Sequence, residues 1–250
     1  MMRTAAIEAD HRTLIVDLPY RGTRGKTADA VLTVRALDGR DELGVEEAWE
    51  RGHSAARIAT SIIGSCASGR DGAIGVDGAR ALSAGDREVV LRSIYAATFS
   101  GEIEAQVECG AGCGEPVCFE IELASLIRIP STPEHHDRGV PDGRDLEDAA
   151  ERGALVLACP DGTDSDPDEV ARLDPNAECE IALTCPACDE TFSVWLDGFE
   201  LIRQQTSRAG GILAQVDLIA SAYGWTEAEI LALPRERRLR YCAFAQARPA

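Results

Sequence analysis

Apolar positions in the first hundred residues follow two periods, and each period predicts a different kind of element. The continuous apolar run at 30–35 predicts a strand. Apolar residues at helical spacing over 46–66 predict one or two helices. A further helix is expected to begin near Ser83, whose hydroxyl can cap it, with a buried stripe over 89–97.

Three stretches lack a sustained apolar pattern. Residues 1–27 hold one short apolar run at 14–16, which predicts a loose arm or an edge strand. The glycine-rich stretch 69–79 predicts a loop. Residues 130–150 are polar, carry proline and glycine and include the acidic run 145–148, so we expect a mobile loop there.

The centre of the chain contains an internal duplication. Residues 102–128 and 178–203 align without a gap after the second cysteine of each copy, and Leu-Ile-Arg at 126–128 repeats at 201–203. Apolar and polar residues alternate beside each cysteine pair, which is typical of strands with one buried face. Each copy therefore predicts a strand, a cysteine turn, a second strand and the start of a helix.

The C-terminal quarter has the pattern of consecutive helices. An apolar face over 212–223 predicts the first, and a capping box at 226–229 predicts a short second helix at 227–233. Pro234 suits the first turn of a final helix at 235–247.

Together these elements predict an α+β fold built on duplicated zinc-knuckle β-hairpins, with flanking helices and a helical C-terminus. The second half is expected to open with a strand at 154–158 and a short helix at 168–173. We expect one folded domain with four parts: an N-terminal arm at 1–27, a first half at 28–128, a flexible acidic insert at 129–153 and a second half at 154–250.

Four of the nine cysteines form two close pairs, one in each copy of the duplication. Cys109 and Cys113 are separated by three residues, and Cys185 and Cys188 enclose Pro-Ala. Zinc prefers four thiolates in a tetrahedron, and a turn with this spacing supplies two of them. We therefore predict one structural Zn²⁺ shared by the four cysteines. The alternatives are that one pair has decayed or that both pairs are buried thiols.

Composition narrows the possible partners. The formal charge of −18 repels phosphate backbones and anionic lipid, and aromatic residues make up 5% of the chain, so nucleic acid and membrane surfaces are poor partners. Such a charge suits a basic protein partner, although solubility explains it more simply. No segment nears the ~20 apolar residues of a membrane span, and no signal-like run opens the chain, which favours the cytoplasm.

The chemistry of the chain argues against catalysis. A closed shell of four thiolates has no open position for water or substrate. No nucleophile, base and orienting residue form a plausible triad in the sequence. We therefore expect a non-enzymatic protein without a small-molecule substrate.

Several segments resemble the baseplate hub and hub-assembly proteins of T-even-type phages, whose relatives occur in contractile injection systems. The resemblance covers roughly 28–250 apart from the insert at 130–150. It rests on the opening strand and turn at 34–42, the central helix at 82–88 and 97–101, the knuckle at 185–188, and above all the tail at 219–234 with Arg237, Arg238 and Tyr241.

This resemblance implies a baseplate assembly factor or a structural baseplate subunit, whose partners are other baseplate or hub proteins. It also implies that the protein can be incorporated into a phage tail-like particle. Two features depart from the family: Gly210-Gly211 interrupts the helix expected before the tail, and the pair Cys109 and Cys113 holds one extra residue.

Five tail residues are candidates for partner binding: Tyr223, Trp225, Arg237, Arg238 and Arg240. The capping box beside the two aromatic residues makes a rigid helical corner, and the three arginines form a basic face for an acidic partner. For the aromatic residues we favour a place in the core, whereas for the arginines a solvated face is an equal alternative.

Two other classes of function remain open on sequence alone. A zinc-ribbon protein–protein adaptor in transcription or RNA metabolism fits the cysteines but not the charge or the scarcity of aromatic residues. A zinc hydrolase or deaminase would require an exchangeable water on the metal.

Overall fold

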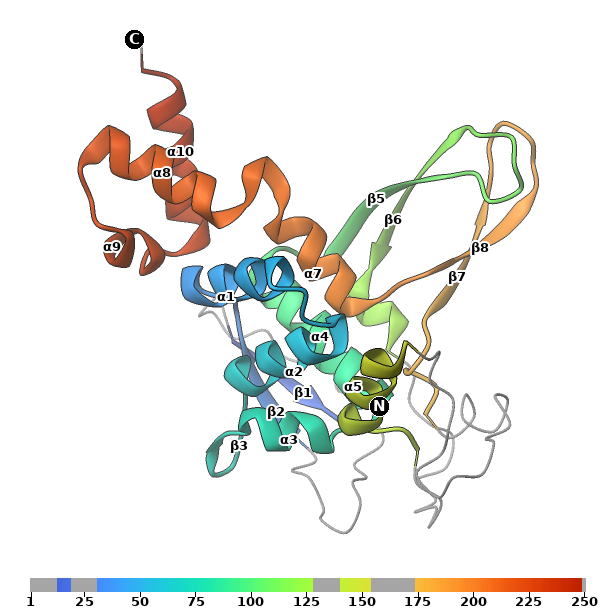
Figure 1. The fold of residues 1–250 in the computed structure, drawn as a ribbon. Coiled ribbons are helices and arrows are strands. Elements are labelled where there is room, and N and C mark those ends of the chain that lie inside the picture. Colours follow the sequence, from blue (N-terminus) through green and yellow to red (C-terminus); the bar gives the residue numbers. More distant parts are fainter. Residues whose placement is uncertain (1–12, 19–30, 128–139, 154–173, 249–250) are drawn as a thin grey trace.

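The computed structural model describes residues 13–18, 31–127, 140–153 and 174–248 (Figure 1). Helices and antiparallel strands occur in separate parts of this fold, so the α+β class is confirmed. The predicted strand at 154–158 and the predicted helix at 168–173 lie outside the described residues.

An antiparallel four-stranded sheet forms the N-terminal part of the core. Its strands, in spatial order, are β1 (Thr13–Asp17), β2 (Val31–Arg35), β3 (Ala67–Gly69) and β4 (Gly72–Ala73). The run at 14–16 therefore belongs to an edge strand, one of the two expectations for it. Val16, Leu32 and Val34 alternate with exposed neighbours and are buried in the main core.

Four helices accompany this sheet: α1 (Gly39–Glu50), α2 (Ala55–Cys66), α3 (Gly75–Ala81) and α4 (Ala84–Thr98). Of these, α2 and α4 contact its strands, and α4 begins at the predicted cap, Ser83. Asp38 and Asp41 form a capping box for α1, and the hydroxyl of Ser83 accepts the amide of Asp86 at the start of α4. The helical pattern over 46–66 thus belongs to two helices, the first of which begins earlier than expected.

The prediction of a loop at 69–79 is wrong, because this stretch contains strand β4 and the start of helix α3. The cause is tertiary: a Cβ added at Gly64 of α2 would lie 2.7 Å from the backbone carbon of Gly75. The two helices can approach this closely only because Gly64 has no side chain.

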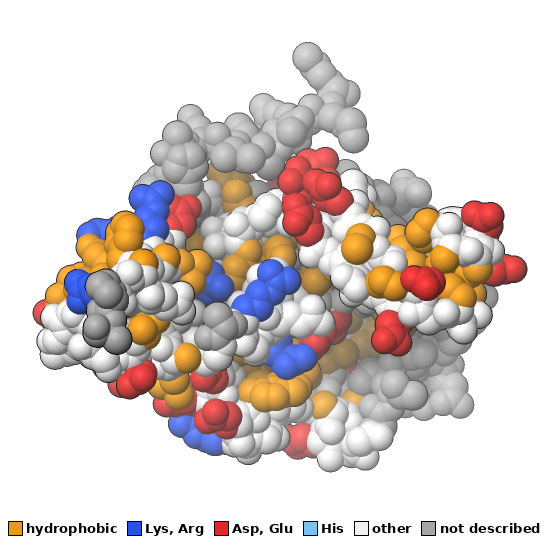
Figure 2. Space-filling view, turned by 90° about the horizontal axis from the view of Figure 1, so that it is seen from above, with side chains coloured by type: hydrophobic (Ala, Val, Ile, Leu, Met, Phe, Trp, Pro, Cys, Tyr) orange, Lys and Arg blue, Asp and Glu red, His pale blue; other side chains and the backbone are white. Residues whose placement is uncertain are grey.

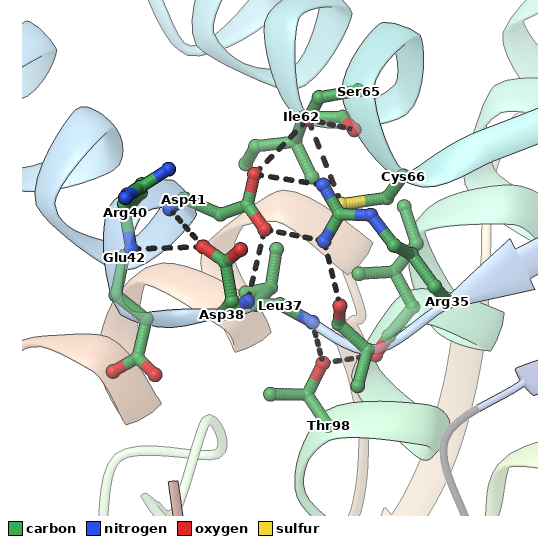
Figure 3. Close-up of polar contacts among 12 residues, drawn as sticks. Arg35, Leu37, Asp38, Arg40, Asp41, Glu42, Ile62, Ser65, Cys66 and Thr98 are labelled. Carbon is green, nitrogen blue, oxygen red and sulfur yellow. Dashed lines mark hydrogen bonds and ion pairs between the residues drawn. The ribbon is translucent and has the colours of Figure 1, made fainter. Parts of the chain in front are cut away.

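A polar cluster joins strand β2 to three helices (Figure 3). Arg35 forms an ion pair with Asp41 of α1 at 2.5 Å, and Ser65 of α2 donates to the same carboxylate. The amide of Leu37 donates to the hydroxyl of Thr98 on α4 at 2.9 Å. Burial raises the pKa of the neighbouring Cys66 thiol to about 12, so it remains a neutral part of the core.

The expectation of a mobile loop over 130–150 is wrong for its second half. Helix α5 (Gly143–Arg152) carries the acidic run and begins with a capping box at Asp142. Its Glu147 is buried, accepts from Thr60 at 2.6 Å and forms an ion pair with Arg80 at 2.8 Å. These bonds dock the helix on α2 and α3. Residues 128–139 lie outside the described residues.

The duplication folds as two separate β-hairpins, as the alternating pattern predicts. The first consists of β5 (Glu102–Glu108) and β6 (Pro116–Glu122), and the second of β7 (Glu180–Thr184) and β8 (Thr191–Trp195). The first continues into the 3₁₀ turn η1 (Leu123–Leu126) and the second into helix α7 (Gly198–Thr206). The hairpins extend away from the main core and converge at their tips (Figure 1).

The C-terminal helices form a lobe with its own small apolar cluster. After the 3₁₀ turn η2 (Arg208–Gly210), the elements are α8 (Gly211–Tyr223), α9 (Glu227–Leu231) and α10 (Arg235–Gln246). Gly210 and Gly211 have φ values of 81° and 75°, so the chain turns here before α8 starts. The amide of Ile212 then donates to Glu46 of α1 at 2.8 Å, which fixes the start of the lobe on the core.

Candidate metal centre

The tips of the two hairpins bring the four predicted ligands together. The Sγ atoms of Cys109 and Cys188 lie 3.8 Å apart, and those of Cys113 and Cys185 lie 3.6 Å apart. All four sulfurs lie within 4.8 Å of one another. A disulfide would need about 2.05 Å, whereas a tetrahedron with Zn–S bonds of about 2.3 Å has edges of about 3.8 Å. The cluster therefore has the dimensions of a four-thiolate metal site and could hold a metal ion.

The two cysteine turns have the same backbone design despite their different lengths. The amide of Cys109 donates to the carbonyl of Glu115 at 3.0 Å, and the amide of Cys185 donates to that of Glu190 at 2.9 Å. The residue after the second cysteine is left-handed in both, with φ of 75° at Gly114 and 58° at Asp189.

The extra residue of the first turn is accommodated by a glycine. Gly112 has φ of 91°, a conformation that side chains rarely adopt. The extra residue between Cys109 and Cys113 therefore does not prevent the four sulfurs from meeting.

Apolar side chains surround one side of the cluster. They come from both hairpins: Val107, Val117, Leu183 and Phe192. A Cβ added at Gly110 would lie 2.8 Å from Cδ2 of Phe192, so the first turn rests directly on the second hairpin. Cys109 and Cys185 are buried beneath this contact, while Cys113 is exposed and Cys188 is half-buried.

The local environment shifts the pKa values of two of these thiols, Cys109 and Cys188, in opposite directions. Burial raises the pKa of Cys109, but the amides of Ala111 and Cys113 and the neighbouring thiols lower it, to about 7 overall. The amide of Glu190 lowers the pKa of Cys188, yet burial and the three neighbouring thiols raise it to about 12. Four sulfurs this close cannot all be thiolates without a cation between them, because like charges raise one another's pKa.

The candidate partner-binding residues divide into two groups. Tyr223 and Trp225 are half-buried, and their rings stack at 5.3 Å at the edge of the C-terminal apolar cluster. Arg237 and Arg240 are exposed on α10.

The expectation that Arg238 shares this exposed basic face is wrong. Its side chain is fully buried, where it forms an ion pair with Glu42 of α1 at 2.5 Å and donates to Gln215 of α8 at 2.8 Å. Arg235 pairs with the same Glu42. A buried carboxylate between two guanidinium groups holds the C-terminal lobe on the core, and no local spacing in the sequence indicates this role for Glu42.

The ranges that the structure describes contain one candidate metal site and no membrane-spanning helix. The cysteine cluster is the one group there of three or more His, Cys, Asp or Glu side chains placed to share a metal ion. None of the helices in those ranges combines the length and the apolar character that crossing a membrane requires. Compared with protein families, curated proteins and solved structures, the chain matches none.

Proposed function

We propose that this protein is a zinc-stapled structural protein that acts as an assembly factor or a structural subunit of the baseplate in a phage-like contractile particle. The observation that carries the proposal is the meeting of four cysteines from two duplicated hairpins at distances suited to a tetrahedral metal. The particle itself is inferred from the resemblance of the tail at 219–234 and of the segments before it.

Zinc is the metal that best fits the donor set. Four thiolates in a tetrahedron suit Zn²⁺, which has no redox chemistry of its own and is bound by cysteine turns of this spacing. When bound, the ion supplies a cross-link between the two hairpins. A two-stranded hairpin is marginally stable alone, so this cross-link would give both hairpins a fixed position relative to each other.

A structural role follows from the same geometry. With all four ligands supplied by cysteine, the metal has no position at which a substrate or a water could be activated. A rigid pair of hairpins that projects from a helical core is instead a shape suited to holding other subunits. The acidic field of the chain favours proteins over nucleic acid as those subunits.

The metal can be tested on the purified protein. We expect one zinc per chain by elemental analysis and a sulfur-only tetrahedral shell by X-ray absorption spectroscopy. A nitrogen or oxygen ligand in the shell would contradict the structural assignment and favour a catalytic zinc.

The particle can be tested separately in cells that produce it. A tagged chain should capture baseplate proteins, and mass spectrometry of purified particles then distinguishes a subunit from an assembly factor that leaves. An eluate without tail or baseplate proteins would contradict the proposal. Capture of transcription proteins would favour the adaptor instead.

A further inference from the structure

The free face of helix α10 is basic and apolar. Arg237, Arg240 and Phe244 follow one another at helical spacing, and all three are exposed, Phe244 to 61%. Within the ranges that the structure describes, neither arginine has an ion-pair partner. Arg238 and Cys242 on the opposite side anchor the helix in its lobe. The face of α10 is therefore rigidly presented and lacks a partner.

The outer face of the first hairpin has the opposite charge. Its strand register places Glu102 opposite Glu122 and Glu104 opposite Glu120, and all four are exposed. The hairpin contains no lysine or arginine. Like charges directly opposite each other destabilise a sheet, so this ladder of glutamates opposes the folding of the hairpin that carries it.

The second hairpin shows that the fold does not require the complete ladder, because one of its two glutamate pairs is absent there. Its corresponding outer face pairs Glu180 with Trp195, then Ala182 with Ser193. Of the positions equivalent to the four ladder glutamates, three in the second hairpin still hold carboxylates (Glu178, Glu180 and Asp197), and Trp195 stands where the first hairpin has Glu120. The acidic ladder has another cause, and a cationic partner is one that would offset its repulsion.

The basic and acidic faces lie on opposite sides of one molecule. Figure 1 places α10 and the hairpins at different ends of the fold, and Figure 2 shows acidic side chains at the hairpin end and basic ones at the end of the C-terminal lobe, with apolar side chains at both. Residues 207–248 contain six arginines and four carboxylates, in a chain whose formal charge is −18. The charge distribution is therefore strongly asymmetric.

We propose that the α10 face of one copy of this chain docks on the outer face of hairpin β5–β6 of a second copy, head to tail. Arg237 and Arg240 pair with the glutamate ladder, and Phe244 covers the neutral pair formed by Gln106 and Cys118. The contact is heterologous: a copy that docks through its α10 face keeps its hairpin face free for the next copy, so the copies form a ring or a filament.

The spacing of the two faces supports this pairing. Arg237 and Phe244 are about 10 Å apart along a helix that rises 1.5 Å per residue. The hairpin face extends about 14 Å from the pair Glu102–Glu122 to the pair Gln106–Cys118, at about 3.4 Å per residue. Arginine side chains are long enough to span the difference. The net repulsion between two copies acts at longer range, and salt of physiological strength screens it beyond about 8 Å.

Charge reversal tests the contact. In sedimentation velocity, the zinc-loaded protein should form species larger than a dimer that dissociate in about 1 M NaCl, where the screening length falls to about 3 Å. Arg237→Glu with Arg240→Glu should give a monomer, and so should Glu102→Arg with Glu104→Arg. An equal mixture of these two double variants retains one intact pair of faces and also places the two reversed faces, of opposite charge, against each other, so it should assemble again.

The duplication supplies the matched control. Glu178→Arg with Glu180→Arg alters the equivalent positions of the second hairpin by the same charge and should still assemble. Circular dichroism and zinc content show whether each variant remains folded. A wild-type protein that is monomeric at all concentrations would overturn the proposal, and so would assembly by either reversed variant alone or a mixture that stays monomeric.

Discussion

The two cysteine hairpins are copies of one unit, and their structures agree most closely at the candidate metal site. The first has seven-residue strands and the second five-residue strands. Both close their cysteine turns with the same amide-to-carbonyl bond and place a left-handed residue after the second cysteine. The turns are restricted by the tetrahedral arrangement of their sulfurs, whereas the outer faces are not.

The hairpins also differ in how they join the core. The second leads into α7, whose Phe199 and Ile202 are buried in the main core. The first leads into a short 3₁₀ turn that buries Leu123. The second hairpin is therefore followed by a core helix, whereas the first is preceded by one, α4, and packs Ile103 in the same core.

The largest effect should come from removing the metal. Chelation, or Cys185→Ser, should abolish a binding free energy on the order of 10 kcal/mol, as in zinc-finger peptides. Because the two hairpins meet each other at their tips, the amides near both tips should lose protection. Hydrogen exchange followed by mass spectrometry measures this. Equal protection with and without metal would show that the sulfurs do not staple the hairpins.

The contact between the two tips can be broken without touching a cysteine. Gly110→Val places a side chain where Phe192 now packs, so we expect a loss of about 3 kcal/mol in the free energy of unfolding through overpacking. Ala111→Val, on the exposed side of the same turn, is the control and should change little. Urea denaturation of the zinc-loaded protein measures both. Equal losses would mean that the tips are not in contact.

A change of pH should affect the contact between Glu88 of α4 and Gly198, at the start of the helix that follows the second hairpin. Glu88 accepts the amide of Gly198 at the start of α7 at 2.9 Å, and burial, aided by the charge of Asp197, raises its pKa to about 7 from 4.5. The folded chain then keeps a proton that the unfolded chain has released. This contribution to stability is complete below about pH 4.5 and is lost as the pH rises through about 7.

Glu88→Gln removes the titration and keeps an acceptor for Gly198. As the pH rises from 5 to 7.5, the wild type should lose about 2 kcal/mol more of its free energy of unfolding than this variant does. Each pKa unit corresponds to about 1.4 kcal/mol. Denaturation with excess zinc across this range measures it. Parallel profiles would exclude Glu88 as the titrating group.

The smallest effect concerns the left-handed position that the copies fill differently. Gly114→Asp should cost about 0.5–1 kcal/mol, and Asp189→Gly should gain a similar amount, because glycine adopts positive φ without steric cost. Thermal unfolding of the two single variants, and of the double variant that carries both substitutions, measures these changes in stability. Changes of the same sign would indicate that the two turns are not equivalent.

Sequence alone determined the local features of this protein. The alternating hairpins, the capped start of α4 at Ser83 and the capping box at Thr226 all depend on residues within a few positions of one another, so a pattern reveals them. The four cysteines could be predicted as one site because the duplication made each pair recognisable. Their meeting at 3.6–3.8 Å between partners is what the fold adds.

Tertiary structure decided what depends on partners far along the chain. Arg238 is buried because Glu42, far earlier in the sequence, lies against it, and Asp174 is buried because it accepts the amide of Gly85 at 2.8 Å. The acidic run at 145–148 belongs to a docked helix because Arg80 and Thr60 bind Glu147. From sequence alone, a charged side chain is expected to be exposed to solvent. Only a partner that the fold brings close stabilises its burial.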